Sequence, residues 1–130
     1  TYSRDHDWSF DGGITVRASA APAYKGGESC VDPEEAFVAS LSSCHMLTFL
    51  AIAARKRYVV DSYEDRAVGI LSKNDAGSLA INKVTLRPLV RFAGERQPTA
   101  EDLVRLHDQA HHACFIANSV KTEVVVEAAG

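Results

Sequence analysis

Apolar and polar positions along this chain fall into patterns that predict both strands and helices. Residues 8–10 and 14–18 are rich in aromatic and β-branched side chains, and they flank an Asp-Gly-Gly sequence. Because glycine readily adopts the positive φ angles of a tight turn, this pattern predicts a β-hairpin. Residues 20–30 hold Pro22 and two glycines, which indicates a loop.

The strongest helix signal begins at Asp32. This residue has a side chain suited to a helix N-cap, Pro33 suits the first helical position, and Glu35 has the spacing of a capping box. The positions that follow are apolar around almost the whole helix, up to a basic Arg-Lys-Arg sequence at 55–57 that suits the negative end of the helix dipole. Such a helix is typically buried in a core or between subunits.

Strand patterns follow this helix. Residues 67–72 predict a strand, and the sequence Asn-Asp-Ala-Gly at 74–77 predicts a turn. Residues 79–92 alternate between apolar and polar side chains, as expected for one long strand. Because proline lacks an N–H group, Pro88 is expected at an edge or a bulge of the sheet.

A second helix is predicted to start at Pro98-Thr99, with Asp102 three residues after the threonine, and to end at residues 118–119. Its apolar stripe consists of Leu103, Leu106, His107, Ala110, Ala113 and Cys114. Residues 122–127 form the last predicted strand. The order is therefore β-β-α-β-β-α-β, with only two helices to cover the sheet. This order predicts a single α+β domain over residues 1–130, with both helices packed on antiparallel sheet.

Composition narrows the class of protein. The 130 residues are 46% hydrophobic and 24% charged, as in soluble globular proteins, and the net charge of −3 argues against a nucleic-acid partner. No membrane is expected, because the longest apolar run, around residues 46–54, is broken by Thr48 and ends at the basic sequence. No signal peptide opens the chain, which favours the cytoplasm. Three cysteines are an odd number and do not indicate a disulfide scaffold.

Two of the cysteines carry the candidate chemistry. Cys44 lies in the middle of the first predicted helix and Cys114 lies near the end of the second. If both helices pack on the same sheet, the two sulfur atoms can approach each other. The pattern leaves a second interpretation equally open, in which both thiols are small apolar side chains of the core.

A metal site is a further alternative. Donor types suited to zinc occur at Cys44, His45, His111, His112 and Cys114. Adjacent helical side chains point roughly 100° apart, so His111 and His112 cannot easily face one ion. The expectation is therefore that no metal is bound.

His107 lies on the apolar stripe and is interpreted as a structural histidine. The pattern assigns no role to Cys30.

The sequence Asp32-Pro33-Glu34-Glu35 followed by Ser43-Cys44, together with a second helix ending in Cys114, resembles the OsmC/Ohr family. The family is named for osmotic induction and organic hydroperoxide resistance, and the resemblance covers nearly the whole chain. It implies an intertwined homodimer. It also implies that Cys44 matches the peroxidatic cysteine, Cys114 the resolving cysteine and Glu34 the family glutamate. The family arginine is matched by Arg4, with Arg17 as the alternative.

The resemblance implies a thiol peroxidase that needs no cofactor. Cys44 would reduce an organic hydroperoxide to an alcohol, and Cys114 would close a disulfide for a dithiol reductant, such as a lipoylated protein, to open. Ten helical residues rise roughly 15 Å, so Glu34 is expected to reach Cys44 of a second subunit in a composite site. His45 and Phe115 depart from the family pattern and indicate a divergent subgroup. The alternative is an OsmC-like protein, weakly active or inactive, that binds apolar small molecules at the dimer interface.

Overall fold

The computed structural model describes residues 2–128, which form two compact units that divide between Phe37 and Val38. The expectation of one domain over the whole chain stays a prediction. In the first unit, strands β1 (His6–Ser9) and β2 (Thr15–Ala18) form the predicted antiparallel hairpin. Gly13 has a φ of 83°, as the turn requires. The loop after the hairpin contains one short 3₁₀ helix, η1 (Pro22–Tyr24).

Helix α1 (Pro33–Arg55) begins in the first unit and continues into the second. Its start has the predicted capping box: the Glu35 N–H donates to Asp32 Oδ1 at 2.8 Å, and the Asp32 N–H donates to Glu35 Oε1 at 3.0 Å. At 23 residues, α1 is long and apolar enough to cross a membrane by length and composition, a test that core helices of soluble proteins also pass. The expectation that no apolar run reaches that length was therefore wrong.

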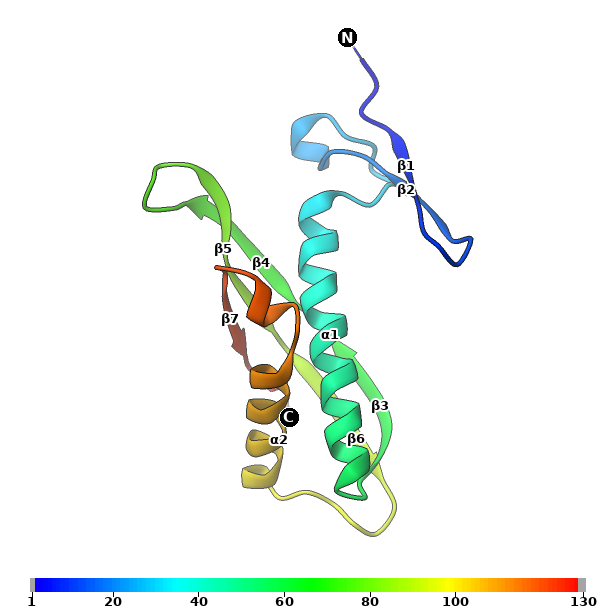
Figure 1. Ribbon diagram of the computed structural model, residues 1–130, viewed down its shortest axis with the longest axis vertical. Helices are drawn as coiled ribbons and strands as arrows, with labels where there is room; N and C mark the ends of the chain where they lie inside the picture. The colour runs from blue at the N-terminus through cyan, green and yellow to red at the C-terminus, as the bar shows by residue number, and fades with distance from the viewer. Residues whose placement is uncertain (1, 129–130) are drawn as a thin grey trace. The chain divides into compact units, whose positions relative to one another are not determined.

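The second unit contains two small sheets and the second helix (Figure 1). Strands β3 (Val59–Asp65) and β6 (Pro88–Ala93) form an antiparallel pair. Strand β4 (Val68–Lys73) pairs antiparallel with β5 (Leu79–Leu86), which pairs parallel with β7 (Glu123–Val126). The α+β class with two main helices is confirmed, while the sheet is mixed rather than purely antiparallel.

The strand order differs from the prediction in two places. Strand β3 was missed because a register shift between Val60 and Ser62 interrupts its alternation. The long predicted strand at residues 79–92 is two strands in two sheets, β5 and β6. Pro88 is the first residue of β6, where its missing N–H costs no ladder bond. The Arg87 N–H, at the break, donates to Asp65 Oδ1 at 2.6 Å.

Helix α2 (Ala100–Ala113) lies beside α1 in the second unit. Thr99 caps it through the predicted capping box with Asp102. The helix ends at Ala113, earlier than predicted, because Cys114 is extended, with φ −72° and ψ 116°. A 3₁₀ turn, η2 (Ala117–Ser119), then leads to β7. The hydrophobic core joins the two helices to the β3–β6 pair through Phe49, Ile52, Ala53, Tyr58, Leu106 and Ala110.

Candidate functional site

The fold brings the two predicted cysteines together. Cys44 is half-buried on α1, and Cys114 is buried at the C-terminal cap of α2. Both thiols are free, and their side chains are hydrogen-bonded to each other. Residues 70 positions apart in the sequence are thus in contact.

The surroundings of the two thiols shift their pKa values in opposite directions. Burial raises the pKa of Cys114, and donating its hydrogen bond to Cys44 raises it further. Burial also acts to raise the pKa of Cys44, but hydrogen bonds outweigh it, so that the pKa of Cys44 is lowered. The donors are the Ile116 N–H, the Cys114 thiol and the Phe115 N–H. At a given pH the thiolate form is therefore more populated at Cys44 than at Cys114.

The backbone donors are available because α2 stops just before them. The chain turns at Cys114, so the N–H groups of Phe115 and Ile116 follow the end of the helix, and both act to lower the pKa of Cys44. Thr48 also lies beside Cys44, but its hydroxyl already donates to the Cys44 carbonyl oxygen at 2.8 Å. The turn after α2 therefore supplies the main stabilisation of a Cys44 thiolate.

A buried imidazole pair joins the same two helices. His45 Nε2 and His107 Nδ1 are 3.0 Å apart, and the rings stack with their centroids 5.2 Å apart. The Phe49 ring also stacks on His107, with the two ring centroids 4.5 Å apart. Burial lowers the pKa of both histidines to about 4, so both rings are neutral at physiological pH. His107 is thus the predicted structural histidine, but the sequence did not reveal His45 as its partner.

Glu34 and Arg4 belong to the first unit. Glu34 lies in the first turn of α1, and its Oε2 is buried with no hydrogen-bond partner among the described residues. The Arg4 guanidinium lies over the Tyr2 ring at 4.5 Å and donates to the Tyr2 carbonyl oxygen at 3.4 Å. A buried carboxylate oxygen without a partner is costly, which makes Glu34 a residue suited to receive a cation.

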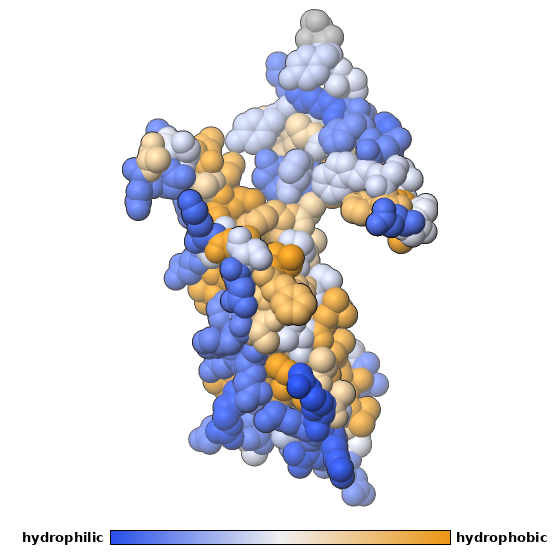
Figure 2. Space-filling model, in the orientation of Figure 1, coloured by the Kyte–Doolittle hydropathy of each residue, from blue (hydrophilic) through white to orange (hydrophobic). Residues whose placement is uncertain are grey.

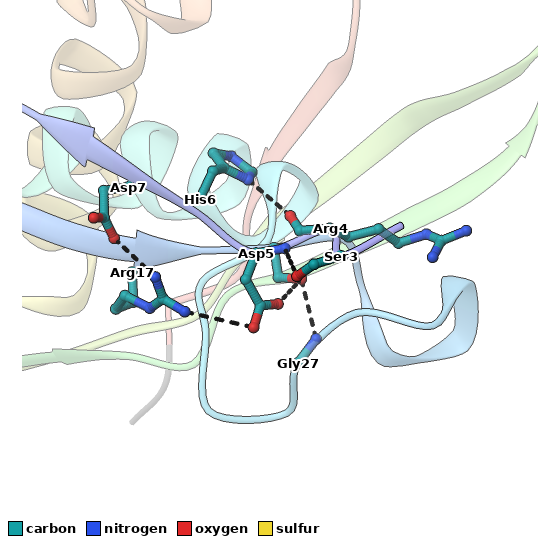
Figure 3. Close-up of polar contacts among 8 residues, drawn as sticks. Ser3, Arg4, Asp5, His6, Asp7, Arg17 and Gly27 are labelled. Atoms are coloured by element: carbon teal, nitrogen blue, oxygen red, sulfur yellow. Dashed lines mark hydrogen bonds and ion pairs between the residues drawn. The ribbon is translucent and has the colours of Figure 1, made fainter. Parts of the chain in front are cut away.

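Arg17 is already held in place (Figure 3). Its guanidinium pairs with Asp5 at 3.5 Å and with Asp7 at 3.3 Å. The Asp7 hydrogen bond is the main reason that the pKa of Arg17 is raised. Because two carboxylates engage Arg17 on the hairpin, Arg4 is the better placed of the two arginines to serve another partner.

The remaining candidates do not assemble into a metal centre. Among residues 2–128, no group of three or more His, Cys, Asp or Glu side chains could hold a metal ion. Nδ1 of the exposed His112 is 2.7 Å from the Asp108 carbonyl oxygen, whereas His111 Nδ1 is buried without a hydrogen-bond partner in the described part of the chain. Cys30 is half-buried in the first unit, next to Gly27.

Comparisons with known proteins agree on one family. The family model described as OsmC-like protein matches residues 26–129. A solved structure of an OsmC-like protein of unknown function from Vibrio cholerae is 57% identical, with a TM-score of 0.97; the match covers 98% of this chain and 86% of that one. No protein with a curated description matches.

Two organic hydroperoxide resistance proteins are similar in fold. The protein from Elizabethkingia anophelis is 18% identical, with a TM-score of 0.76; the match covers 98% of this chain and 89% of that one. The protein OhrB of Bacillus subtilis is 20% identical, with a TM-score of 0.76; the match covers 99% of this chain and 93% of that one. At identities this low, the likeness to these two proteins shows a shared fold and nothing further.

Proposed function

The chain belongs to the OsmC-like protein family, and on that premise we propose that it is a cysteine-based peroxidase that reduces organic hydroperoxides to alcohols. The observation that carries this proposal is the hydrogen-bonded thiol pair of Cys44 and Cys114, in which the pKa of Cys44 alone is lowered. The organic hydroperoxide resistance proteins of the same fold support a peroxide-related role at the level of the family.

The reaction takes two electrons from the thiol pair. The Cys44 thiolate attacks one peroxide oxygen, the O–O bond breaks, and the alkoxide leaves with a proton as the alcohol. Cys44 is then a sulfenic acid, which the Cys114 thiol attacks to form a disulfide and release water. A dithiol, such as the lipoyl group of a lipoylated protein, returns both thiols by exchange. In balance, one peroxide and one dithiol are consumed, and one alcohol, one water and the disulfide form of the dithiol are produced.

Arg4 and Glu34 complete the proposed site. A lower pKa increases the thiolate fraction of Cys44 but also decreases its nucleophilicity, so acidity alone gives a modest gain. Arg4 is proposed to hold the peroxide oxygen and to stabilise the departing alkoxide. Glu34, whose buried Oε2 has no partner among the described residues, is proposed to orient that guanidinium by a bidentate pair.

We further propose a homodimer with composite active sites. The second unit exposes large apolar side chains, including Leu47 on α1, 61% exposed, and Phe115 beside the cysteine pair, 80% exposed. Figure 2 shows hydrophobic surface over α1 in the orientation of Figure 1. A second copy would bury such surface and would bring its own Glu34 toward Cys44.

The free thiols suit a reducing compartment such as the cytoplasm.

Turnover with single cysteine variants tests the proposal. Purified protein with cumene hydroperoxide and dihydrolipoamide should consume peroxide, Cys44→Ser should abolish consumption, and Cys114→Ser should stop after one turnover and over-oxidise. Cys30→Ser is the matched control and should keep the activity. If the protein binds apolar molecules without turnover, the unchanged protein will consume no peroxide above the Cys44→Ser background, and the peroxidase proposal fails.

A further inference from the structure

A pocket of about 350 Å³ lies in the second unit, where the end of α1 meets the N-terminal half of α2. Its lining residues are Lys56, Tyr58, Arg96, Asp102, Arg105 and Leu106. Three of these side chains are cations and one is a carboxylate, while the side chains of Tyr58 and Leu106 are buried. Arg55, the last residue of α1, lies about 16 Å along the helix from Cys44, so the pocket is separate from the cysteine pair.

Arg96 is fixed in position within the pocket. Its guanidinium lies over the Tyr58 ring at 4.5 Å, and its Nε donates to the Lys56 carbonyl oxygen at 2.9 Å. The terminal amino groups of Arg96 make no hydrogen bond among residues 2–128. The Lys56 ammonium likewise has no ion pair with any described residue. Both cationic groups thus line the pocket without an ion pair to any residue that the structure describes.

The one carboxylate of the pocket is already engaged. Asp102 accepts from Arg105 Nη2 at 2.7 Å and from the Thr99 N–H at 3.1 Å, and the Tyr58 hydroxyl lies 3.5 Å from it. The Thr99 N–H is the main reason that the pKa of Asp102 is lowered to about 2, and the Arg105 hydrogen bond adds to it. Asp102 therefore neutralises Arg105 and caps α2, and it does not neutralise Lys56 or Arg96.

We propose that this pocket binds a small dianion of the phosphate monoester class, with the phosphoryl group between Arg96 and Lys56. The four charged side chains leave two positive charges, which match a dianion, and the N-terminal end of α2 adds a favourable dipole. Guanidinium groups hold phosphate oxygens through paired N–H donors. The pocket volume suits a small ligand.

The test is an NMR titration of the full chain with phenyl phosphate in 0.15 M salt, where diffuse electrostatic attraction is largely screened. The amide signals of Tyr58 and Leu106 should shift and saturate. Lys56→Gln/Arg96→Gln should weaken the affinity at least tenfold. The matched control is Arg55→Gln/Arg57→Gln, which removes the same charge beside the pocket and should change the affinity less than threefold.

Two outcomes would overturn the proposal: equal weakening in both double variants, or saturable shifts that avoid the pocket residues. Folding of each variant is checked by its thermal midpoint, and Lys56→Gln alone, at an exposed position, provides a milder variant that should weaken binding at least threefold. Saturating phenyl phosphate should also raise the thermal midpoint of the unchanged protein more than that of Lys56→Gln/Arg96→Gln. Cys44→Ser should bind normally, which separates this proposal from the peroxidase proposal.

Discussion

The buried pair of His45 and His107 should make the stability of this protein depend steeply on mild acid. Each ring is almost fully buried, and burial lowers each pKa from 6.5 to about 4. In the unfolded chain the same rings take up protons near pH 6.5. Protons are therefore bound more strongly by the unfolded state, so the stability contributed by the neutral pair is complete above about pH 6.5 and is lost as pH falls toward 4.

The size of the effect follows from these pKa values. Between pH 7 and pH 5, each histidine should lose about 2 kcal/mol of stabilisation, and the pair about 4 kcal/mol, by proton linkage. Charged groups near His107 moderate this: Asp108 and Asp65 both act to raise its pKa. A loss of about 4 kcal/mol is a large part of the 5–15 kcal/mol that is typical of folded domains.

Urea unfolding at pH 7 and pH 5, at one fixed protein concentration, measures this loss. His45→Phe/His107→Leu replaces both rings by apolar side chains and should remove most of the pH dependence. The matched control His112→Gln changes an exposed histidine and should keep it. The reasoning is refuted if the double variant loses as much stability between pH 7 and pH 5 as the unchanged protein does.

Two further substitutions test the backbone features described above. Phe115→Pro removes one N–H donor to the Cys44 sulfur, and the extended residue before it accepts a following proline. It should raise the pKa of Cys44, seen as an iodoacetamide alkylation profile moved to higher pH, whereas Phe115→Ala should leave the profile in place. Gly26→Ala would force a Cβ atom onto the Ala20 carbonyl oxygen and should cost more than about 2 kcal/mol in urea unfolding. The control Gly12→Ala, where a Cβ meets nothing within 4 Å, should cost less than about 1 kcal/mol.

Local signals in the sequence predicted the helices well. The capping residues Asp32 and Thr99 act through hydrogen bonds to residues three positions away, so the sequence alone identifies where both helices begin. Strands depend on partners far away in the chain. The bulge near Asp61 is set by pairing between β3 and β6, and no local pattern revealed it. At Pro88 the sequence indicated an irregular position, but not that the chain changes sheet there.

In the candidate site too, the sequence predicted some features and missed those that depend on the fold. The family resemblance predicted Cys44 and Cys114 as site residues, where the pattern alone left core thiols equally open, and the fold brings the two into hydrogen-bonding contact. The pairing of His45 with His107 joins residues 62 positions apart, and each looks like an isolated histidine in the sequence. The thiolate donors of Phe115 and Ile116 are backbone groups, whose direction depends on where α2 ends and not on which side chains follow.

Peptide mapping by mass spectrometry, after one equivalent of cumene hydroperoxide and without reductant, tests the central claim most directly. The account predicts a single new species in which the peptides of Cys44 and Cys114 are joined by a disulfide, two hydrogens lighter than the sum of the free peptides, with Cys30 still reduced. Recovery of both peptides as free thiols, with the peroxide unconsumed, would contradict the account.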